Sequence, residues 1–510
     1  MEALMTIISK NSQLINKKDL SNSFNELNSF IKDAAKKSVT AHEVETAIWK
    51  MVLKIGKEAM GNFFSMLGSG DLGDKMQLPS GKKLVKFKNT SSKSYMTIFG
   101  EFNLNRSVYG TREKQRIECI PLDARLKLPD SKFSYLLQDW DLSFAVENSF
   151  NSTNKTINKI LGLTQSVDSL ERMNYKMSLD VDEYRDQKKI PSEEEEGAIF
   201  VVSADGKGIP MRKEENELRI ENHRKKGIKN NKKKMATVGT AYTIDPLIRT
   251  PEDVVKSLFS KGREKNSEGA KDRPHAQNKN VYASLTYEMG GSIYESSDVV
   301  FSRLRDETVS RNSKVNRPFV LLMDGQESLW TKAGEYFPEG AIQILDLLHV
   351  TPRLWQAAHL FCEEGSKYAI DFVKARLLKI LQGDVLNMVK GLKKMGTMNN
   401  FKGTKKESLE KICNYLVKNQ DRLRYDVYLA NGLPIASGVI EGACRYYVKD
   451  RMERSGMRWS IDGAQAMLDV RSVHLNGDWD DYLDFKRRKE GSDLYANMDT
   501  ANDIEWPLAG

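Results

Sequence analysis

The spacing of apolar residues changes along the chain, and each spacing predicts a different kind of element. Up to about residue 70 the spacing is helical: Thr40 and Glu43 fit a capping box, and apolar residues then recur every three or four positions. We expect this stripe to pack in a core, although contact with a partner helix would produce the same pattern. Its residues are Val44, Ile48, Val52, Ile55 and Ala59.

Strands are predicted next, and helices follow them. Over residues 81–110 lysines alternate with apolar residues, and a stretch rich in aromatic and β-branched residues follows. Helical spacing returns over 133–178, where Thr153–Leu161, Gly162 and Ser166–Met173 have the layout of a helix-turn-helix motif. Helix pairs of this length are also common as plain packing units, and we place that interpretation somewhat ahead of base recognition.

The most informative segment follows an acidic linker. Ala198–Asp205 is an apolar, β-branched run that ends in an acid, which is typical of a buried central strand. Further strands are expected at Ile209–Arg212 and Met235–Ile244. The connection between them is very polar, so we expect a β-hairpin with a long, mobile, basic tip. The lysines of this tip are Lys225, Lys226, Lys229, Lys232, Lys233 and Lys234, and all of them except Lys229 are candidates for DNA contacts.

The pattern of a buried strand ending in an acid then recurs. Pro318–Asp324 is such a run, and another apolar strand, Ala341–Leu345, is followed by Asp346 and His349. Between the two acid-tipped strands, helices are expected to start near Pro251, Ala276 and Ser292.

The rest of the chain is expected to be helical. Residues 352–430 are rich in lysine and show no strand pattern. A helix should run from Ser437 to about Arg454, and another from Ser460 to about His474. From Gly477 onward no pattern predicts an element.

Composition narrows the class of protein. A chain of 510 residues is long enough for about three domains. The formal net charge of +9 would attract a polyanion such as DNA, although a mildly basic surface without a partner is the alternative. No apolar run is long enough to span a bilayer and no secretory signal is recognisable, so we expect a cytoplasmic protein without a membrane function. The four cysteines are scattered, which predicts reduced packing residues and no zinc module.

Three acids suggest a site for divalent cations. Asp205 and Asp324 end two buried strands, and Glu441 follows on a helix. Two ions held about 3.5–4 Å apart need several hard, anionic oxygens that converge on one spot. Mg²⁺ suits such ligands, Mn²⁺ is expected to substitute, and an activated water could then attack a phosphodiester. Any one of these acids alone would be interpreted as an ordinary surface residue.

Neighbouring residues fit the same chemistry. Gly206, Gly208 and Gly325 would let a DNA backbone approach the acids. In the helix from Ser437, the residues Glu441, Arg445 and Lys449 follow one another at i+4 spacing beside an apolar stripe, although a plain surface Glu–Arg pair would look the same. The candidates for phosphate neutralisation, each of which could equally be a solvated surface charge, are Lys207, Arg445, Lys449 and Arg451.

Several motifs spread over the chain are long enough to be specific. They are Ile120–Arg125 with Leu128–Pro129, Ser203–Met211, Met235–Gly239 with Tyr242, Arg249–Asp253, Leu322–Gly325 and Ser437–Gly442. With the order of the elements, they make most of the chain resemble the ISKra group of bacterial insertion-sequence transposases. The resemblance implies a ribonuclease-H-like catalytic domain in which Asp205, Asp324 and Glu441 form a catalytic, metal-binding DDE triad. It also implies an all-helical insertion between the second Asp and the Glu.

Asp346-x-x-His349 resembles an element of other DDE transposases that helps to shape the active site and to organise nearby DNA. His349 is therefore expected to act beside the triad, by donating to a phosphate or by holding a flanking base. A local hydrogen-bonded pair of Asp346 and His349 is the alternative. Arg353 could extend the same DNA-binding surface, whereas Trp355 is expected to pack in the core.

These inferences predict a multi-domain α/β (α+β) protein. Its ribonuclease-H-like mixed sheet has flanking helices, is interrupted by an all-helical insertion, and is preceded by helical and β-ribbon DNA-binding regions. The predicted regions are 1–75 (helical), 76–130 (β-ribbon), 131–190 (helix-turn-helix-like), 197–350 and 433–478 (catalytic core), 351–432 (insertion) and 479–510 (tail).

The expected function is metal-dependent cleavage of the insertion-sequence ends and their transfer into target DNA by a dimer or larger assembly. A structure-specific resolvase would use the same acids but needs little beyond the catalytic core. A DNA-binding protein derived from a transposase should have lost at least one acid. A hydrolase with histidine ligands is disfavoured, since the six histidines show no His-x-x-x-His spacing.

Overall fold

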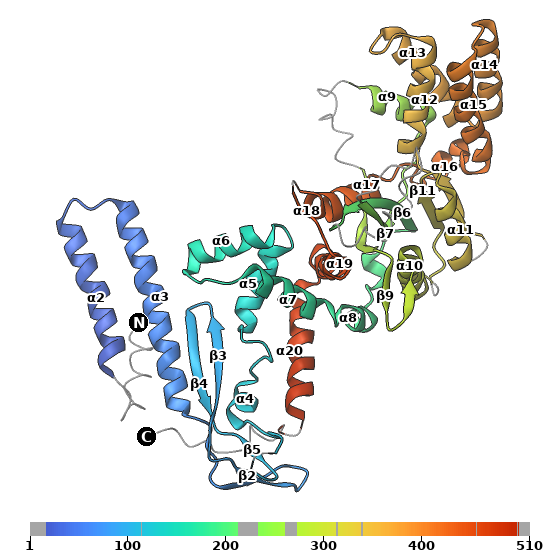
Figure 1. The fold of residues 1–510 in the computed structure, drawn as a ribbon. Coiled ribbons are helices and arrows are strands. Elements are labelled where there is room, and N and C mark those ends of the chain that lie inside the picture. The colour runs from blue at the N-terminus through green and yellow to red at the C-terminus, as the bar shows by residue number, and fades with distance from the viewer. Residues whose placement is uncertain are drawn as a thin grey trace, which may run out of the picture. The chain divides into compact units, whose positions relative to one another are not determined.

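The structure, a computed structural model, describes residues 17–113, 115–212, 233–260, 273–312, 315–337, 340–454, 456–496 and 498. The chain forms two compact units (Figure 1): unit 1 comprises residues 1–174 and 479–510, and unit 2 comprises residues 175–478. Within the described residues, no helix combines the length and the apolar character that crossing a membrane would need.

Unit 1 is built from helices and two small antiparallel sheets. β1, β2 and β5 form one sheet, and β3 and β4 form a hairpin, which confirms the strands predicted over residues 81–110. Two helices flank Gly162, as predicted, and α20 forms in a region where no element was predicted. The elements are α2 (Lys17–Lys36), α3 (Ala41–Leu67), β1 (Lys75–Gln77), β2 (Lys83–Lys86), β3 (Ser91–Thr97), β4 (Gly100–Arg106), β5 (Tyr109–Gly110), α4 (Pro121–Leu126), α5 (Tyr135–Ala145), α6 (Phe150–Leu161), α7 (Val167–Ser178, whose last residues belong to unit 2) and α20 (Trp479–Tyr495).

The predicted capping box starts α3. The Glu43 N–H donates to Thr40 Oγ1 at 3.3 Å, and the Thr40 N–H donates to Glu43 Oε2 at 2.9 Å. The apolar stripe that follows does not pack in a closed core: of the described residues of α3, Leu67 alone is buried, and Val52 is 41% exposed. The prediction of a core stripe is wrong here, and the alternative of contact with another helix fits better, because α2 packs along α3.

Unit 2 contains the remaining elements. They are α8 (Val181–Gln187), β6 (Ile199–Pro210), β7 (Lys233–Ile244), α9 (Pro251–Phe259), β8 (Gln277–Ser284), β9 (Tyr287–Met289), β10 (Ser292–Tyr294), α10 (Ser296–Asn312), β11 (Phe319–Met323), α11 (Glu327–Tyr336), β12 (Ile342–Leu345), α12 (Leu347–Phe361), α13 (Lys367–Leu381), α14 (Val385–Met398), α15 (Gly403–Lys418), α16 (Tyr425–Ala430), α17 (Gly438–Ala443), a π-helical segment (Cys444–Lys449), α18 (Asp450–Met452) and α19 (Ile461–Leu475).

A five-stranded mixed sheet with the order β12-β11-β6-β7-β8 forms the centre of unit 2. β12, β11 and β6 are parallel, whereas β7 is antiparallel to both of its neighbours. Successive residues of β6 point to opposite faces, so Ile199 and Val201 join one buried cluster while Phe200 and Val202 join the other. Because both faces are covered, the run is apolar without alternation. The predicted mixed α/β class is confirmed.

Three elements around this sheet differ from the prediction. The predicted hairpin forms from β6 and β7, but Ile209 continues β6 instead of starting a separate strand. The helix expected near Ala276 is wrong, because β8 occupies these residues and α19 packs over it: the Val281 N–H donates to Asn476 Oδ1 at 2.8 Å. β10 precedes the helix expected at Ser292. The predicted tip extends from Lys213 to Lys234, but its last two lysines, Lys233 and Lys234, begin β7. Residues 213–232, with Lys225, Lys226, Lys229 and Lys232, lie outside the described residues.

The helices α12 to α16 form the all-helical block that was predicted between the second Asp and the Glu helix. They share one buried apolar cluster with a face of the sheet, and Trp355 packs against that cluster as expected. The block is therefore an insertion that is anchored on the sheet (Figure 1).

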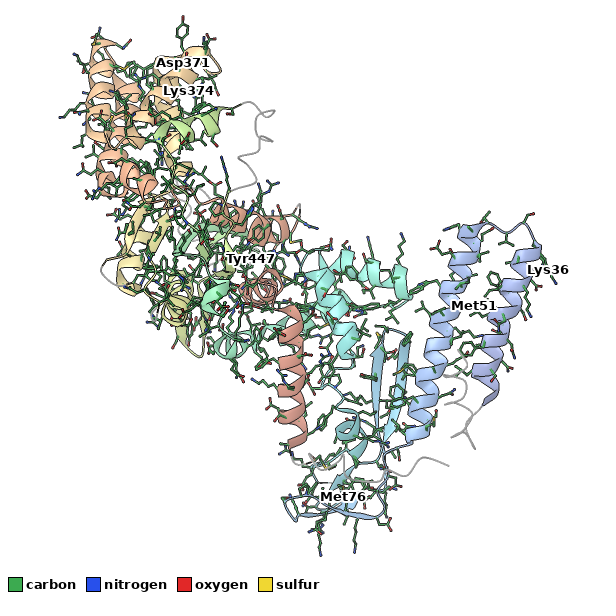
Figure 2. All side chains as sticks on the ribbon, turned by 180° about the vertical axis from the view of Figure 1, so that it is seen from behind. Lys36, Met51, Met76, Asp371, Lys374 and Tyr447 are labelled. Atoms are coloured by element: carbon green, nitrogen blue, oxygen red, sulfur yellow. The ribbon has the colours of Figure 1, made fainter. Side chains whose placement is uncertain are left out.

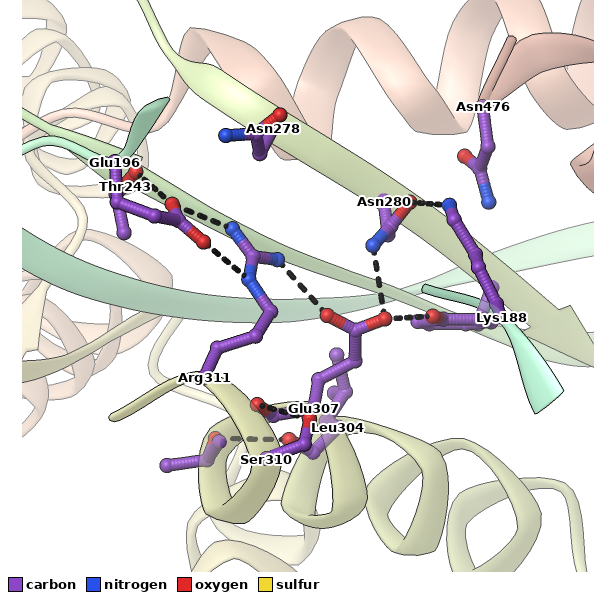
Figure 3. Close-up of polar contacts among 12 residues, drawn as sticks. Lys188, Glu196, Thr243, Asn278, Asn280, Leu304, Glu307, Ser310, Arg311 and Asn476 are labelled. Carbon is purple, nitrogen blue, oxygen red and sulfur yellow. Dashed lines mark hydrogen bonds and ion pairs between the residues drawn. The ribbon is translucent and has the colours of Figure 1, made fainter. Parts of the chain in front are cut away.

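A buried ion network fastens the acidic linker ahead of β6 to α10 and the sheet (Figure 3). The Arg311 side chain, 2% exposed, donates from Nε and Nη2 to the two carboxylate oxygens of Glu196 at 2.8 and 2.9 Å. Its Nη1 donates to Glu307 at 2.8 Å. The Thr243 and Tyr282 hydroxyls donate to Glu196 and Glu307, so the buried carboxylates are well supplied with donors.

Candidate active site

The register of two parallel strands brings two acids to the edge of the sheet where β11 ends: Asp324 directly follows β11, whereas Asp205 lies within β6, which continues to Pro210 instead of ending at the acid as predicted. Leu321 of β11 pairs with Val202 of β6. Three residues after this pair lie the two acids, Asp324 and Asp205. The two carboxylates are close enough for the charge of Asp205 to act on Asp324. Burial, first, and then the charge of Asp205 raise the pKa of Asp324, while the Gln326 N–H bond and His349 lower it.

Glu441 is brought to this edge by the residue that caps its helix. Ser437 is fully buried at the N-terminus of α17, and its Oγ accepts a hydrogen bond from the Ile440 N–H at 3.2 Å. The Ser437 hydroxyl donates to Ser203 Oγ at 3.4 Å, and the Ser437 N–H donates to Asp346 Oδ2 at 3.2 Å. Ser437 therefore ties the Glu441 helix both to β6 and to the end of β12.

Asp346 and His349 lie beside these acids. Asp346 caps α12 by accepting the Leu348 N–H at 2.8 Å, and burial raises its pKa to about 6. One turn along α12, His349 Nε2 lies 4.0 Å from Glu441 Oε1. The structure thus brings together Asp205, Asp324, His349 and Glu441, which are remote in the sequence, in one part of unit 2. It gives the Asp346 carboxylate backbone partners, which sequence analysis had not foreseen.

Cys444 is a neighbour of the site that sequence analysis treated only as a packing residue. Its Sγ donates to Asp205 Oδ2 at 3.4 Å, and the Gly206 N–H donates to Asp205 Oδ1 at 2.6 Å. Burial and the charge of Asp205 raise the pKa of the Cys444 thiol, so it stays protonated and acts as a donor. Cys444 begins the π-helical segment, a rare conformation that is common at functional sites. Its buried neighbour Tyr447 appears within unit 2 in Figure 2.

The donor set fits divalent cations with hard oxygen preference. Within the described residues, neither Asp205 nor Asp324 has a salt bridge with Lys or Arg, and Glu441 keeps 47% of its side chain exposed. Carboxylates left without a protein cation at one sheet edge are suited to hold a metal ion. No group of three His, Cys, Asp or Glu side chains in the described residues is arranged to hold one ion. Mg²⁺ prefers such oxygen ligands and is usually held by one or two carboxylates together with several waters.

Lysines gather around one acid next to the π-helical segment. Lys233 forms an ion pair with Glu453, and the charges of Lys233, Lys207 and Lys449 all lower the pKa of that carboxyl. Lys449 is exposed and Lys207 is half-buried, so both keep cationic surface for a phosphate. Lys233 is already partnered in this structure.

The other candidate cations divide into exposed and buried groups. Arg445 has a 79% exposed side chain and lies 4.0 Å from Asp450. Lys234 is half-buried, and Arg353 is exposed. Arg451 is 1% exposed and lies over the Trp459 ring at 4.9 Å. The prediction that Arg451 contacts DNA is corrected, because its guanidinium is enclosed in the protein.

The glycines beside the acids face protein side chains, and at Gly325 this corrects the predicted role. A Cβ at Gly325 would lie 2.4 Å from Tyr415 Cε2, so the ring of Tyr415 on α15 fills the space that was assigned to DNA. Cβ atoms at Gly206 and Gly208 would meet Met235 and Lys233 at 3.1 Å. No sequence signal linked Tyr415 to the site, because the residues that it touches are distant in the chain.

Comparison with known proteins adds one match. The chain is similar over residues 34–244 to an uncharacterised protein family, UPF0236. This region includes the β-ribbon strands, β6 with Asp205, and β7, and it ends before Asp324 and Glu441. No curated protein matches the chain.

Proposed function

We propose that the chain is a DDE-type DNA transposase of the ISKra group, with a ribonuclease-H-like catalytic core in unit 2. It would bind the ends of an insertion sequence, cut them and join them to target DNA, acting in the cytoplasm on the nucleoid. Its partners would be double-stranded DNA and further copies of the same chain, because two ends have to be paired.

The observation that carries this proposal is the meeting of three acids from separate elements. Asp205 from β6, Asp324 after β11 and Glu441 on α17 lie at one edge of a mixed sheet, with His349 4.0 Å from Glu441. The lysines around Glu453 provide positive charge nearby. Phosphodiester chemistry of this kind requires carboxylates that bind metal ions and, next to them, basic side chains that bind phosphates.

The proposed reaction has two in-line displacements at one site. A water attacks the phosphodiester at the element end, the P–O3′ bond breaks, and a 3′ hydroxyl is released. That hydroxyl then attacks a phosphodiester of target DNA, so one P–O bond replaces another without a covalent protein intermediate. Asp205, Asp324 and Glu441 would hold two Mg²⁺ or Mn²⁺ ions, which supply Lewis-acid stabilisation of the attacking and leaving oxygens when bound.

The chain's own residues would position the substrate. Lys207, Lys449 and Arg445 would neutralise phosphate oxygens, and His349 would donate to a phosphate or hold a flanking base. Cys444 holds Asp205 in place through its thiol. The β-ribbon and the α6–α7 pair of unit 1 are assigned to end recognition.

The test is incubation of the purified protein with Mg²⁺ and a plasmid that carries the inverted repeats of the element. Asp205→Ala, Asp324→Ala and Glu441→Ala should each abolish cutting and joining. Asp306→Ala is the matched control, because this exposed carboxylate lies on α10 and pairs only with its neighbour Arg305 on the surface among the described residues. Undiminished cutting by any of the three triad variants would refute the role assigned to that residue. Cutting without strand transfer would favour a resolvase instead.

A further inference from the structure

The helical insertion carries most of the net positive charge of the chain. Residues 351–432 contain 15 Lys and Arg against 8 Asp and Glu, a formal net charge of +7, compared with +9 for all 510 residues. Eight of these lysines lie on α14, on α15 and in the turn between them. Lys406 and Lys418 form salt bridges with Glu410 and Glu327, and the other six form none among the described residues. The six, called here the insertion lysine cluster, are Lys390, Lys393, Lys394, Lys402, Lys405 and Lys411.

The cluster is exposed, and one of its lysines has an aromatic neighbour: the ring of Phe401 lies 5.7 Å from Lys405 Nζ. All six side chains are exposed, and within the described part of the chain none of them forms a salt bridge, whereas the adjacent Lys406 pairs with Glu410. Lys390 and Lys394 are one helical turn apart, so their like charges destabilise α14 slightly. α14 contains no Asp or Glu, so its three lysines have no carboxylate on their own helix, whereas Glu407 and Glu410 lie among the lysines of α15.

The lysines of α14 point away from the core. Its buried residues are Val385, Met388, Val389, Leu392 and Gly396. With 3.6 residues per turn, Lys390 and Lys394 fall on the opposite side of the helix and Lys393 lies on its flank. α14 and α15 lie in the same part of the insertion as α13 (Figure 1). Asp371 and Lys374 of α13 are labelled in Figure 2.

α15 connects this cluster to the acids. Tyr415 of α15 packs on Gly325, the residue after Asp324, and the Arg353 guanidinium lies 5.0 Å from the centre of the Tyr415 ring. Lys411 lies one helical turn before Tyr415. Lys405 lies ten residues before Tyr415, and ten residues span about 15 Å along a helix. Since the phosphates of one DNA strand repeat about every 3.4 Å along the duplex axis, this distance corresponds to roughly four or five base pairs.

We propose that the insertion lysine cluster binds the phosphate backbone of duplex DNA that leads away from the phosphate being cut. This inference rests on the proposed function, because it takes the acids as the point where the DNA is held. Ammonium groups on flexible side chains suit phosphates better than base edges, so the contact adds affinity without sequence preference. Arg353 on Tyr415 would form the end of this surface that is nearest to the acids.

The test compares salt-dependent DNA binding of three full-length triple variants with the wild type, using a labelled duplex of about 30 base pairs between 50 and 200 mM salt. The first is Lys390→Ala/Lys393→Ala/Lys394→Ala, and the second is Lys402→Ala/Lys405→Ala/Lys411→Ala. The control is Lys189→Ala/Lys256→Ala/Arg305→Ala, which removes the same charge from exposed positions of unit 2 outside the insertion.

Each cluster variant should lower the slope of log affinity against log salt by up to about 2.7, since each lost phosphate contact removes roughly 0.9. The control should keep the wild-type slope. If both cluster variants bind with the slope and affinity of the control, the inference is overturned. Mg²⁺-dependent plasmid cutting, measured on the same proteins, separates the two proposals. If the wild type cuts the plasmid but the cluster variants keep the wild-type slope, the transposase proposal stands and the DNA-binding role of the cluster is refuted. If the cluster variants lower the slope but the wild type does not cut, the role of the cluster stands and the transposase proposal is refuted.

Discussion

The contact between Tyr415 and Gly325 can be tested by adding a single carbon atom. A Cβ at residue 325 would lie 2.4 Å from Tyr415 Cε2 and 2.6 Å from the hydroxyl oxygen, far inside the usual separation of roughly 3.5–4.0 Å. The backbone of Gly325 is not in the left-handed region. Gly325→Ala therefore adds steric conflict without backbone strain. Moving the ring would disturb its contact with Arg353, and overpacking of this kind costs about 1–3 kcal/mol.

Local hydrogen exchange of the amides of β11 and α15 is the suitable assay, because a chain with two units need not unfold in a single step. Gly325→Ala should weaken protection there by about 1–3 kcal/mol. In a Tyr415→Ala background the same change should cost less than roughly 0.5 kcal/mol, as expected for sites that no longer interact. Tyr415→Phe is the control, since the ring carbons that meet the new Cβ remain and so should most of the cost.

An equal cost of Gly325→Ala in the wild-type and Tyr415→Ala backgrounds would refute this packing argument. It would instead support the prediction that Gly325 lets DNA approach, above all if the Gly325→Ala/Tyr415→Ala double variant still failed to cut the plasmid. Restored cutting in the double variant would instead show that the glycine serves the fit of the insertion to the Asp324 turn.

Three further predictions concern stability and positioning. Arg311→Met should destabilise the sheet edge by about 3–5 kcal/mol, because Glu196 would lose its buried cation; unchanged exchange in β7 and α10 would contradict this. Burial raises the pKa of Asp141 to about 7, so unit 1 should lose stability as the pH rises from about 4 to about 7. Asp141→Asn should remove up to about 4 kcal/mol of that loss. Melting curves at pH 5 and pH 8 measure this, and an equal pH dependence in the wild type and in Asp141→Asn would contradict the prediction. Ser437→Ala should cost about 1 kcal/mol and reduce cutting more than DNA binding; parallel loss of both activities would be inconsistent with a capping role.

The elements that carry the acids could be predicted from sequence because their local patterns agree with their final surroundings. β6 and β11 are covered on both faces, so they appear as unbroken apolar runs, and each run stops at its acid. The Glu441 helix has a capping serine and a stripe of apolar residues that the structure buries. Tertiary contacts reinforce these local signals instead of opposing them.

β8, Arg451 and the glycine contacts could not be predicted because distant residues decide them. The first half of β8 is polar and strand-like only because it pairs with β7 and is covered by α19. Arg451 has the spacing of a surface cation, but Trp459 encloses it. Tyr415 reaches Gly325 across the whole insertion. In each case the deciding contact comes from a residue that is distant in the sequence. The local spacing of apolar and polar residues does not reveal such a contact.

Iron-directed cleavage of the protein tests most directly whether the three acids share one cation site. Fe²⁺ binds carboxylate sites at least as well as Mn²⁺, and with ascorbate and peroxide it cuts the peptide chain next to where it is bound. The account predicts cuts close to Asp205, Asp324 and Glu441 in the same protein, suppressed by excess Mg²⁺ and lost together in Asp205→Asn. Cuts confined to one of these segments, or cuts that persist in Asp205→Asn, would contradict it.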